Sequence, residues 1–355
     1  MEGRYGWLVQ NIAREEVQRA LAHEAALDLE PGPENVVAVF PLAFQGNDER
    51  YEVLGIGLAE TVKPEHADVV DFVGYCGTGR NRRLEAAGVL DLVPCHYSSL
   101  PWLLSRGPLA VDVLLLTVPP PDRHGDIRLG LADEYLGTLV ESARVVIAET
   151  SDRVPRMAGG RVLGASDIDV LVPTKRAPVE YTPRPPTVDD LRVAERVAEL
   201  VPDGATIQIG IGSLPSAILG ALTGHADLGV HSGLIGDGVA DLVEAGVVTG
   251  ARKTVDPGHV VTGMVMGSAR VFDFVDDNPK VRLCGTEHTH ASGVLHRLDR
   301  LVAINSALEV DLSGQVNAEV VGGAYVGAVG GAADFLRGAS GSRDGLPIIA
   351  LPSTA

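Results

Sequence analysis

The sequence predicts an α/β protein whose strands form open, mostly parallel sheets. Nearly continuous apolar runs of strand length, at residues 110–118 and 205–209, are typical of strands that helices cover on both faces. Segments with apolar residues at helical spacing accompany them, at residues 133–143 and 215–222. Such alternation implies parallel strands joined by right-handed crossovers. The second half repeats the order of strand, glycine loop and helix seen in the first.

The length of 355 residues fits two α/β domains better than one core. Prolines and charged residues crowd together at residues 173–187, which predicts a boundary between residues 1–185 and residues 186–355. A hydrophobic fraction of 45% and 42 glycines suit a compact enzyme with many tight loops.

Charge and cysteine content exclude several classes of protein. A net charge of −18 leaves no basic excess to neutralise phosphates, so nucleic acid is not an expected partner. The three cysteines have no Cys-x-x-Cys spacing, which favours a reducing cytoplasm. Residues 1–14 lack the apolar region of a signal peptide, and no apolar segment reaches about 18 residues. We therefore expect a cytoplasmic protein without a membrane partner.

The first half offers a helix, then strands and glycine turns in alternation. In chain order we expect a helix at residues 13–29, a strand at 36–40, a strand at 69–73, a glycine turn at 74–80, a helix that carries Leu84 to Leu90, a strand at 110–118, a turn at 119–126, a helix at 133–143 and a strand at 144–149.

In the second half, Thr187 and Asp190 resemble a capping box for a helix that ends near Leu200. A strand at residues 205–209 then breaks into a glycine loop, and a strand at 228–231 ends in a second glycine-rich turn. Ligands of open α/β sheets bind at the carboxyl ends of strands, where glycines let backbone N–H groups approach an anion or a thioester. These two loops are therefore the predicted binding region.

Several segments together resemble one known family. They are 206–215 (TIQIGIGSLP), 228–232 (LGVHS), 237–238 (DG), 244–246 (EAG), 273–279 (DFVDDNP), 304–307 (INSA), 310–316 (VDLSGQV) and 334–339 (DFLRGA). In order and spacing, from about residue 69 to residue 355, the chain resembles the acetyl-CoA hydrolase/transferase family, and within it the 4-hydroxybutyrate CoA-transferases. The resemblance implies two similar domains of class I CoA-transferase type, a homodimer, and coenzyme A bound as an acyl-CoA substrate.

The resemblance also implies a mechanism that this chain does not match. In the family, a glutamate after the His-Ser or His-Thr pair attacks the thioester and carries CoA covalently. Here that position is Gly233, and the glutamine expected after the paired glycines is replaced by Ala332. Family strands and helices beyond residue 355 are also expected but absent from the sequence.

The resemblance places coenzyme A near two glycine segments. The residues expected to bind it are Gln208, Gly210, Ile211, Gly212, Gly330 and Gly331. The acyl group is expected beside Ser232, Gly233 and Ala332.

Residues 284–290, a polar loop after a predicted strand at 280–283, contain the side chains that could replace the family glutamate. Glu287, His288 and His290 offer a general base, a general acid and an oxyanion donor. An exposed polar loop explains the same residues equally well. Close spacing on a loop is a weak metal signal, so no metal is expected.

Three functions remain open at this stage. The first is an acyl-CoA enzyme with an altered reaction that forms no glutamyl-CoA intermediate, namely hydrolysis, C–C cleavage or decarboxylation of a CoA thioester. The second is a CoA-transferase or thioester hydrolase with a different nucleophile. The third is a non-catalytic subunit that partners a catalytic homologue.

Overall fold

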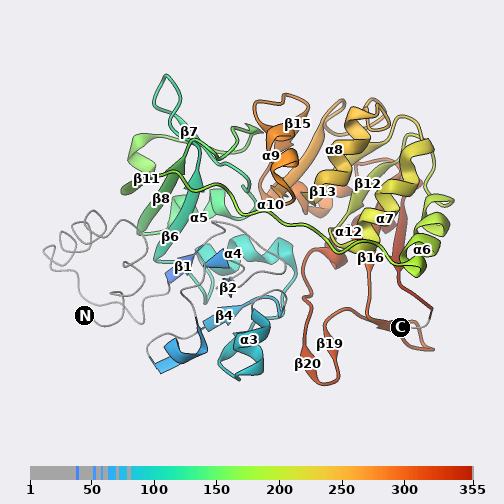
Figure 1. The fold of residues 1–355 in the computed structure, drawn as a ribbon, viewed down its shortest axis with the longest axis horizontal. Helices are drawn as coiled ribbons and strands as arrows, with labels where there is room; N and C mark the ends of the chain where they lie inside the picture. The colour runs from blue at the N-terminus through green and yellow to red at the C-terminus, as the bar shows by residue number, and fades with distance from the viewer. Residues whose placement is uncertain are drawn as a thin grey trace, which may run out of the picture.

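The computed structural model describes residues 37–39, 51–52, 57–58, 63–68, 72–77 and 81–353. Two sheets, one from each half of the chain, lie side by side (Figure 1). The helix expected at residues 13–29 lies outside the described residues, and so do residues 78–80 of the expected glycine turn.

The first sheet has four strands, and every neighbouring pair in it is parallel. Its order is β1 (Val37–Val39), β6 (Val113–Val118), β8 (Val145–Ser151) and β11 (Val170–Thr174). The strands predicted at residues 36–40, 110–118 and 144–149 are confirmed as β1, β6 and β8. Between β6 and β8 the chain forms α5 (Leu136–Ser142), which confirms the crossover helix predicted there.

Shorter elements surround the first sheet. They are β2 (Tyr51–Glu52), β3 (Gly57–Leu58), η1 (Pro64–Asp68), β4 (Phe72–Gly74), α3 (Asn81–Ala86), β5 (Leu90–Leu92), η2 (Tyr97–Ser99), α4 (Leu100–Ser105), β7 (Ile127–Arg128), β10 (Val162–Leu163) and η3 (Ala165–Asp167). The expected helix through Leu84 to Leu90 was too long. Gly88 has a φ of +68°, a left-handed conformation that ends helices, and Leu90 belongs to β5, which pairs with β4.

The second sheet has seven strands, also all parallel between neighbours. Its order is β21 (Leu346–Ala350), β16 (Leu301–Ser306), β12 (Thr206–Ile209), β13 (Gly229–Ile235), β14 (Val260–Val265), β15 (Val281–Leu283) and β9 (Ala158–Gly159). Six of these strands come from the second half of the chain. The seventh, β9, comes from the first half and pairs with β15 at the end of the sheet.

Helices and two hairpins complete the second half. They are α6 (Val188–Ala198), α7 (Ser213–Ala221), η4 (Leu222–Gly224), α8 (Asp237–Glu244), α9 (Ala269–Val275), α10 (Thr286–Thr289), α11 (Ser292–Leu295), the hairpin of β17 (Glu309–Val310) with β18 (Val316–Asn317), the hairpin of β19 (Val320–Val321) with β20 (Ala324–Tyr325), and α12 (Ala332–Gly341).

The capping box predicted for α6 is confirmed. Thr187 Oγ1 accepts from the backbone N–H of Asp190 at 3.1 Å, and the Asp190 carboxylate accepts from the N–H of Thr187 at 2.9 Å. These bonds satisfy two N–H groups that the first turn leaves without helical partners.

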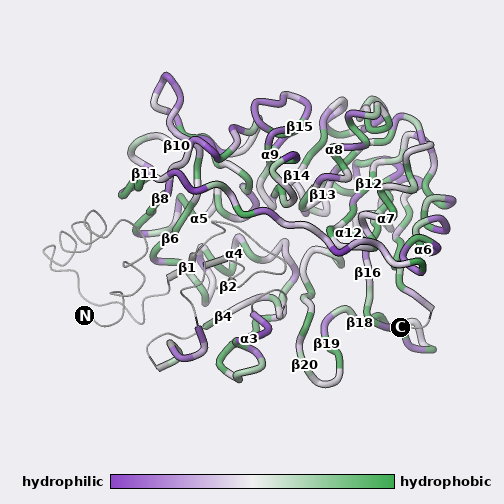
Figure 2. Tube along the Cα trace, in the orientation of Figure 1, coloured by the Kyte–Doolittle hydropathy of each residue, from purple (hydrophilic) through white to green (hydrophobic). Residues whose placement is uncertain are grey.

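The proline-rich segment at residues 173–187 crosses in extended form from β11 to α6 (Figure 1). Much of it is hydrophilic (Figure 2), as a surface connection should be. One cluster of buried apolar side chains nevertheless includes strands of both sheets, among them Leu114 of β6 and Val230 of β13. The division at residue 185 therefore stays a prediction about domains, since the hydrophobic core continues across it.

Two predictions around the expected site were wrong in local structure. The strand expected to end at residue 231 continues as β13 to Ile235, so Gly233 lies inside a strand and not in a turn. Residues 284–290 are not a loop, because Thr286–Thr289 forms α10 and its backbone N–H groups bond back toward Gly285 and Thr286.

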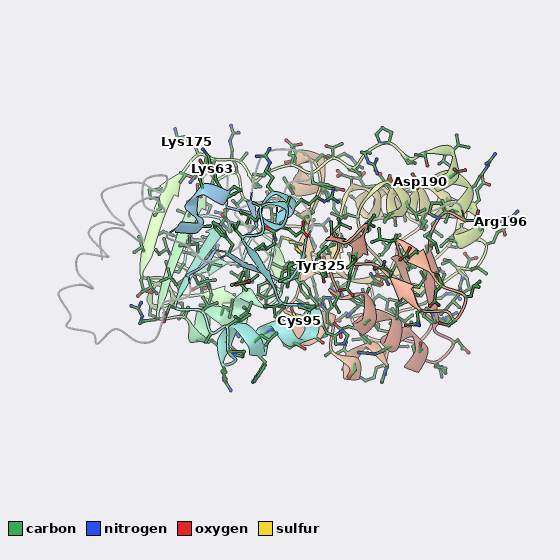
Figure 3. The ribbon with its side chains drawn as sticks, turned by 90° about the horizontal axis from the view of Figure 1, so that it is seen from below. Lys63, Cys95, Lys175, Asp190, Arg196 and Tyr325 are labelled. Carbon is green, nitrogen blue, oxygen red and sulfur yellow. The ribbon has the colours of Figure 1, made fainter. Side chains whose placement is uncertain are left out.

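Contacts between the halves gather around the second hairpin and α12. The backbone N–H of Gly77 donates to Gly327 at 2.8 Å, and Tyr325 N–H donates to Glu85 of α3 at 3.3 Å. Figure 3 places Cys95 and Tyr325 near the middle of the molecule, between the two halves. His290, which is described below, lies in this region between Tyr97 and Phe335 of α12.

Candidate functional site

A cleft opens at the carboxyl ends of β12, β13 and β14, where the sequence predicted it. It is lined by two glycine loops, the segment after β14 and part of the crossing segment, namely Tyr181, Pro183, Ile209, Gly210, Ile211, Gly212, Ser216, Leu219, Leu234, Ile235, Gly236, Asp237, Gly238, Val239, Met266 and Gly267. Helices α7 and α8 begin at its edge (Figure 1). Most of the lining is apolar or glycine, so backbone groups supply much of its polarity.

The beginnings of α7 and α8 explain the two glycine loops. Gly212, the residue before α7, has a φ of +123°, which non-glycine residues rarely adopt. Neither Gly212 before α7 nor Gly236 before α8 can cap with a side chain, so the first N–H groups of both helices are not capped in that way. Free N–H groups at helix N-termini are suited to binding phosphate, carboxylate or a polarised carbonyl.

The residues predicted to bind coenzyme A do not all line this cleft. Gly210, Ile211 and Gly212 do. Gln208 is buried one position deeper in β12, where its Oε1 accepts from Asn305 Nδ2 at 2.9 Å. Gly330 and Gly331 lie elsewhere, because the carbonyl of Gly330 accepts from the N–H of Tyr97 at 3.0 Å.

A second feature, the His290 pocket, lies against β13 and the start of α12. The His290 ring is 4% exposed and stacks on Tyr97 with ring centres 4.8 Å apart, while Phe335 of α12 covers it at 4.6 Å. Burial lowers the pKa of His290 from 6.5 to about 3. The imidazole is therefore neutral at physiological pH.

The contacts of Thr289 Oγ1 are compatible with a tautomer of His290 that carries its proton on Nδ1. The Thr289 hydroxyl donates its only proton to the carbonyl of Gly285 at 3.2 Å. In this tautomer, the 2.8 Å contact between Thr289 Oγ1 and His290 Nδ1 is a bond in which Nδ1–H donates. In the neutral ring this leaves Nε2 as an unprotonated acceptor, which is the form that a general base requires.

Glycines make room for this nitrogen. A Cβ built on Gly331 would lie 2.6 Å from Nε2 of His290, and one built on Gly233 would lie 3.0 Å from Nε2 and 2.8 Å from Cε1. Real side chains do not approach so closely, so the imidazole fills space that side chains at these positions would occupy. Ala332 follows Gly331 as the first residue of α12.

Gly233 adjoins the cleft along the chain. The next residues of β13, Leu234 and Ile235, line the cleft. Ser232, the residue before, is 1% exposed and its hydroxyl donates to the carbonyl of Ile209 at 3.0 Å, which ties β13 to β12. Ser232 is therefore engaged in holding the strands together.

Sequence reasoning missed Glu134, a carboxyl group brought to the site by the first half of the chain. A Cβ on Gly263 would lie 2.8 Å from the carbonyl oxygen of Gly233 and 3.2 Å from Cγ of Glu134. The backbone of residues 131–134 runs along β14, and Asp133 N–H donates to the Gly263 carbonyl at 3.0 Å. The position of Glu134 near Gly233 depends on this pairing between the halves. In the sequence, Glu134 stands at the start of a predicted helix with nothing to set it apart.

Burial gives this acidic pair unusual properties. Glu134 is 4% exposed, and burial raises its pKa to about 8, with the neighbouring Asp133 adding to the rise and a hydrogen bond with Tyr97 opposing it. Burial, with the charge of Glu287 nearby, raises the pKa of Asp133 to about 6. Glu134 also has a φ of +44°, an uncommon conformation for a non-glycine residue. A neutral carboxylic acid in hydrogen-bond contact with Tyr97 thus lies beside the strand of Gly233.

The three residues predicted as catalytic, Glu287, His288 and His290, are not brought together. Glu287 is exposed, and its charge helps to raise the pKa of Asp133. The ring of His288 bonds through Nε2 to Asp256 at 2.7 Å, whereas the ring of His290 lies between Tyr97 and Phe335. Since α10 turns each side chain toward a different neighbour, His290 alone faces Gly233.

Thiol chemistry finds little support here. Burial raises the pKa of Cys284 to about 12, and burial with the charge of Asp334 raises the pKa of Cys95. A thiol must ionise to act as a nucleophile, so neither cysteine is activated.

Among the described residues, no helix is long and apolar enough to cross a bilayer.

Comparison with known proteins identifies the family. The profile of the acetyl-CoA hydrolase/transferase N-terminal domain matches residues 65–183, and the profile of its C-terminal domain matches residues 267–355. The chain belongs to the acetyl-CoA hydrolase/transferase family. The 4-hydroxybutyrate coenzyme A transferase of Clostridium kluyveri is 40% identical over 286 residues, which are 80% of this chain and 65% of that protein. The succinyl-CoA:acetate/propanoyl-CoA:succinate CoA transferase of Fasciola hepatica is 38% identical over 280 residues, 78% of this chain and 59% of that protein.

These matches span less than two thirds of the length of either curated relative. Solved structures agree on the fold. RipA from Yersinia pestis superposes with a TM-score of 0.76 at 32% identity, covering 82% of this chain and 67% of RipA. The 4-hydroxybutyrate CoA-transferase of Porphyromonas gingivalis superposes with a TM-score of 0.69 at 29% identity, covering 92% of this chain and 79% of that protein. The α/β fold with parallel sheets predicted from the sequence is thereby confirmed.

Proposed function

We propose that this protein binds acyl-CoA thioesters in the glycine cleft and cleaves them with water, without a glutamyl-CoA intermediate. Membership of the family and the transferase names of its relatives support a CoA thioester as the substrate. The resemblance puts the family glutamate at Gly233, which has no side chain to attack a thioester. The reaction therefore needs another group, and His290 is the best placed.

The observation that carries this proposal is the position of His290 Nε2. This nitrogen lies against the backbone of Gly233 and Gly331, and Gly233 is followed by Leu234 and Ile235 of the cleft. Within the part of the chain that the structure describes, no hydrogen bond reaches it. A neutral imidazole with an acceptor nitrogen can serve as a general base, although a pKa of about 3 makes His290 a weaker base than an exposed histidine.

Hydrolysis would proceed through a tetrahedral intermediate. Nε2 of His290 takes a proton from water while the water oxygen attacks the thioester carbonyl carbon. The tetrahedral intermediate collapses, the C–S bond breaks, and the imidazolium returns the proton to the departing CoA thiolate. Tyr97, stacked on the ring, and Glu134, hydrogen-bonded to Tyr97, keep the imidazole in position. The N–H groups at the starts of α7 and α8 are suited to the anionic parts of coenzyme A.

One observation favours a second candidate, CoA transfer through a different nucleophile. Glu134 brings a carboxyl group close to the backbone of Gly233 and Gly263, next to the position of the family glutamate. A carboxylate there can form an anhydride and then a thioester, as the family mechanism requires. Its raised pKa of about 8 weakens this candidate, because the protonated acid is a poor nucleophile at neutral pH.

The test is turnover of an acyl-CoA panel in ¹⁸O-labelled water containing ¹³C-labelled acetate, followed by mass spectrometry. Hydrolysis places one ¹⁸O in the released acid and no label in any CoA product. His290→Gln should lower kcat about 10²-fold or more, since general-base catalysis contributes that much, while coenzyme A still binds. His124→Gln, an exposed histidine in a turn of the first half, serves as the matched control and should leave the rate unchanged.

Each result separates the candidates. If the parent chain forms labelled acetyl-CoA and Glu134→Gln does not, the reaction is CoA transfer through Glu134 and not hydrolysis. Full activity in His290→Gln would remove His290 from the mechanism. Tight coenzyme A binding with no turnover of any panel member would favour a non-catalytic subunit.

The proposal includes a homodimer in the cytoplasm, which the resemblance and the cysteine content predict. The division into domains at residue 185 and the acyl pocket beside Ser232, Gly233 and Ala332 belong to it as well. Light scattering coupled to size-exclusion chromatography measures the oligomeric state directly.

A further inference from the structure

We propose that His231, Asp256 and His288 form a binding site for a divalent transition-metal ion of the zinc type. The three residues come from β13, from the segment between α8 and β14, and from α10. This site is separate from the His290 pocket and does not depend on the proposed function. Sequence spacing does not reveal this site, because successive ligands are 25 and 32 residues apart along the chain.

Geometry is the first argument. Each of the three side chains offers one ligand atom, and these atoms all lie within 4.8 Å of one another. Two imidazoles and one carboxylate are a donor set that suits zinc and its neighbours in the first transition row, whereas magnesium and calcium prefer oxygen ligands. Three protein ligands also leave a fourth position for water, as in zinc sites that are not closed.

The second argument is an unsatisfied nitrogen on His231, whose side chain is fully buried. Its Nε2 contacts the carbonyl of Thr289 at 3.2 Å, and because a carbonyl only accepts, Nε2 carries the proton. Nδ1 is then an unprotonated lone pair, and it is buried without a hydrogen-bond partner. Buried polar atoms are rarely left so, and a cation would satisfy this one.

The other two ligands can adapt to a metal. His288 Nε2 and Asp256 Oδ2 are 2.7 Å apart, closer than the roughly 3.3 Å that two ligands of a tetrahedral zinc ion keep when each bond is about 2.0–2.1 Å. The side chain of His288 is 33% exposed, so its ring can move outward and admit the ion in place of the shared proton.

Two cations lie close enough to oppose a metal. Arg282 pairs with Asp256 at 3.3 Å, and Lys253 donates to the carbonyls of Val230 and His259 at 2.8 and 2.7 Å. Arg282 bonds to Oδ1 of Asp256, whereas the contact to His288 uses Oδ2, so one carboxylate oxygen remains for the ion. Backbone carbonyls hold the Lys253 ammonium in place. We expect these charges to reduce affinity without blocking the ligand positions.

A bound ion would join β13 to α10 through His231 and His288. His290 follows two residues after His288, so the ion would also restrict the segment that carries the His290 ring. Its expected role is to hold α10 in place.

Metal binding to the full-length, tag-free chain tests the proposal. The protein is treated with chelator, then titrated with Zn²⁺ by calorimetry and with Co²⁺ by visible absorption. One ion per chain is expected, with X-ray absorption showing two imidazole ligands on the bound zinc. Asp256→Asn and His288→Gln should each bind at least about tenfold more weakly, while His124→Gln and Asp273→Asn, both exposed, should bind as the parent does.

Thermal unfolding with and without Zn²⁺ compares each protein with itself, so a variant that is less stable than the parent chain can still be tested. A fixed Zn²⁺ concentration that raises the Tm of the parent chain and of both controls should raise the Tm of Asp256→Asn and His288→Gln by less. Failure of the parent chain to bind one ion, bound zinc without imidazole ligands, or equal binding by parent and site variants would each overturn the proposal.

Discussion

At the scale of single residues, Gly233 and His290 are complementary in volume. A Cβ on Gly233 would lie 2.8 Å from Cε1 of His290, and that ring is held between Tyr97 and Phe335. We expect Gly233→Ala to destabilise the fold by about 1–3 kcal/mol, the usual cost of an extra methyl group in a packed interior. Chemical unfolding followed by circular dichroism measures the change.

The double variant Gly233→Ala/His290→Ala should recover part of this loss, because truncating the ring makes space for the new methyl group. Gly220→Ala is the control, since nothing lies within 4 Å of a Cβ there and alanine favours the helix. If Gly233→Ala were as stable as the parent chain, the close packing of His290 against Gly233 would be wrong.

Residues of the site differ in how far the sequence could predict them. His290 was predicted because it follows a strand in a polar segment, and its role stays a prediction, while Glu287 and His288 contact other neighbours. Glu134 was missed, because its place beside Gly233 depends on the pairing of residues 131–134 with β14. Side-chain direction on a one-turn helix and pairing between halves are long-range properties, and local patterns do not contain them.

At the scale of elements, strongly apolar strands and capped helices were predicted well. The runs that became β6 and β8 are buried on both faces, so their composition alone marks them. The turn predicted after residue 231 was wrong, because Gly233 lies inside β13 and allows close packing there. The short α10 was also missed, since four residues carry no readable helical period.

The capping box of α6 allows a prediction for an element. Thr187→Ala removes the hydroxyl that accepts from the N–H of Asp190. We expect a loss of about 1 kcal/mol in unfolding free energy, as for other N-cap threonines, measured by thermal or urea unfolding. Thr182→Ala, an exposed change in the same crossing segment, should alter stability by less than about 0.5 kcal/mol. Equal effects of the two substitutions would show that the cap does not stabilise α6.

At the scale of the whole molecule, the two halves are joined by hydrogen bonds around the site. Ser98 of η2 bonds to the Asp334 carboxylate of α12 through both its N–H at 3.1 Å and its hydroxyl at 2.8 Å. The backbone of Glu134 accepts from the N–H of Thr286 at 2.8 Å. Opening this region would bring water to Glu134, so its protonation is coupled to the joining of the halves.

This coupling predicts a dependence of stability on pH. The folded pKa of Glu134 is raised from 4.5 to about 8, so the folded chain holds a proton that the unfolded chain has released between these values. Its contribution is fully present below about pH 4.5 and is lost as pH rises through about 8, at up to about 1.4 kcal/mol per pH unit. Glu134→Gln should remove this slope.

Urea unfolding of the parent chain and of Glu134→Gln at several pH values between 5 and 8.5 makes the comparison. Other titrating groups are shared, so the difference between the two curves reports Glu134 together with its coupling to Asp133. Parallel curves for the two proteins would mean that the carboxyl group ionises as freely in the folded state as in the unfolded one.

The two-residue strand β9 has a consequence for how this chain can be divided. It comes from the first half, yet it covers the outer side of β15 in the seven-stranded sheet. A fragment that begins at residue 186 would leave β15 with an unpaired row of N–H and C=O groups. Such an open edge is a template for pairing with other chains, so the second half expressed alone should self-associate. The crossing segment therefore marks a change of sheet along the chain, and cutting there exposes a surface that invites aggregation.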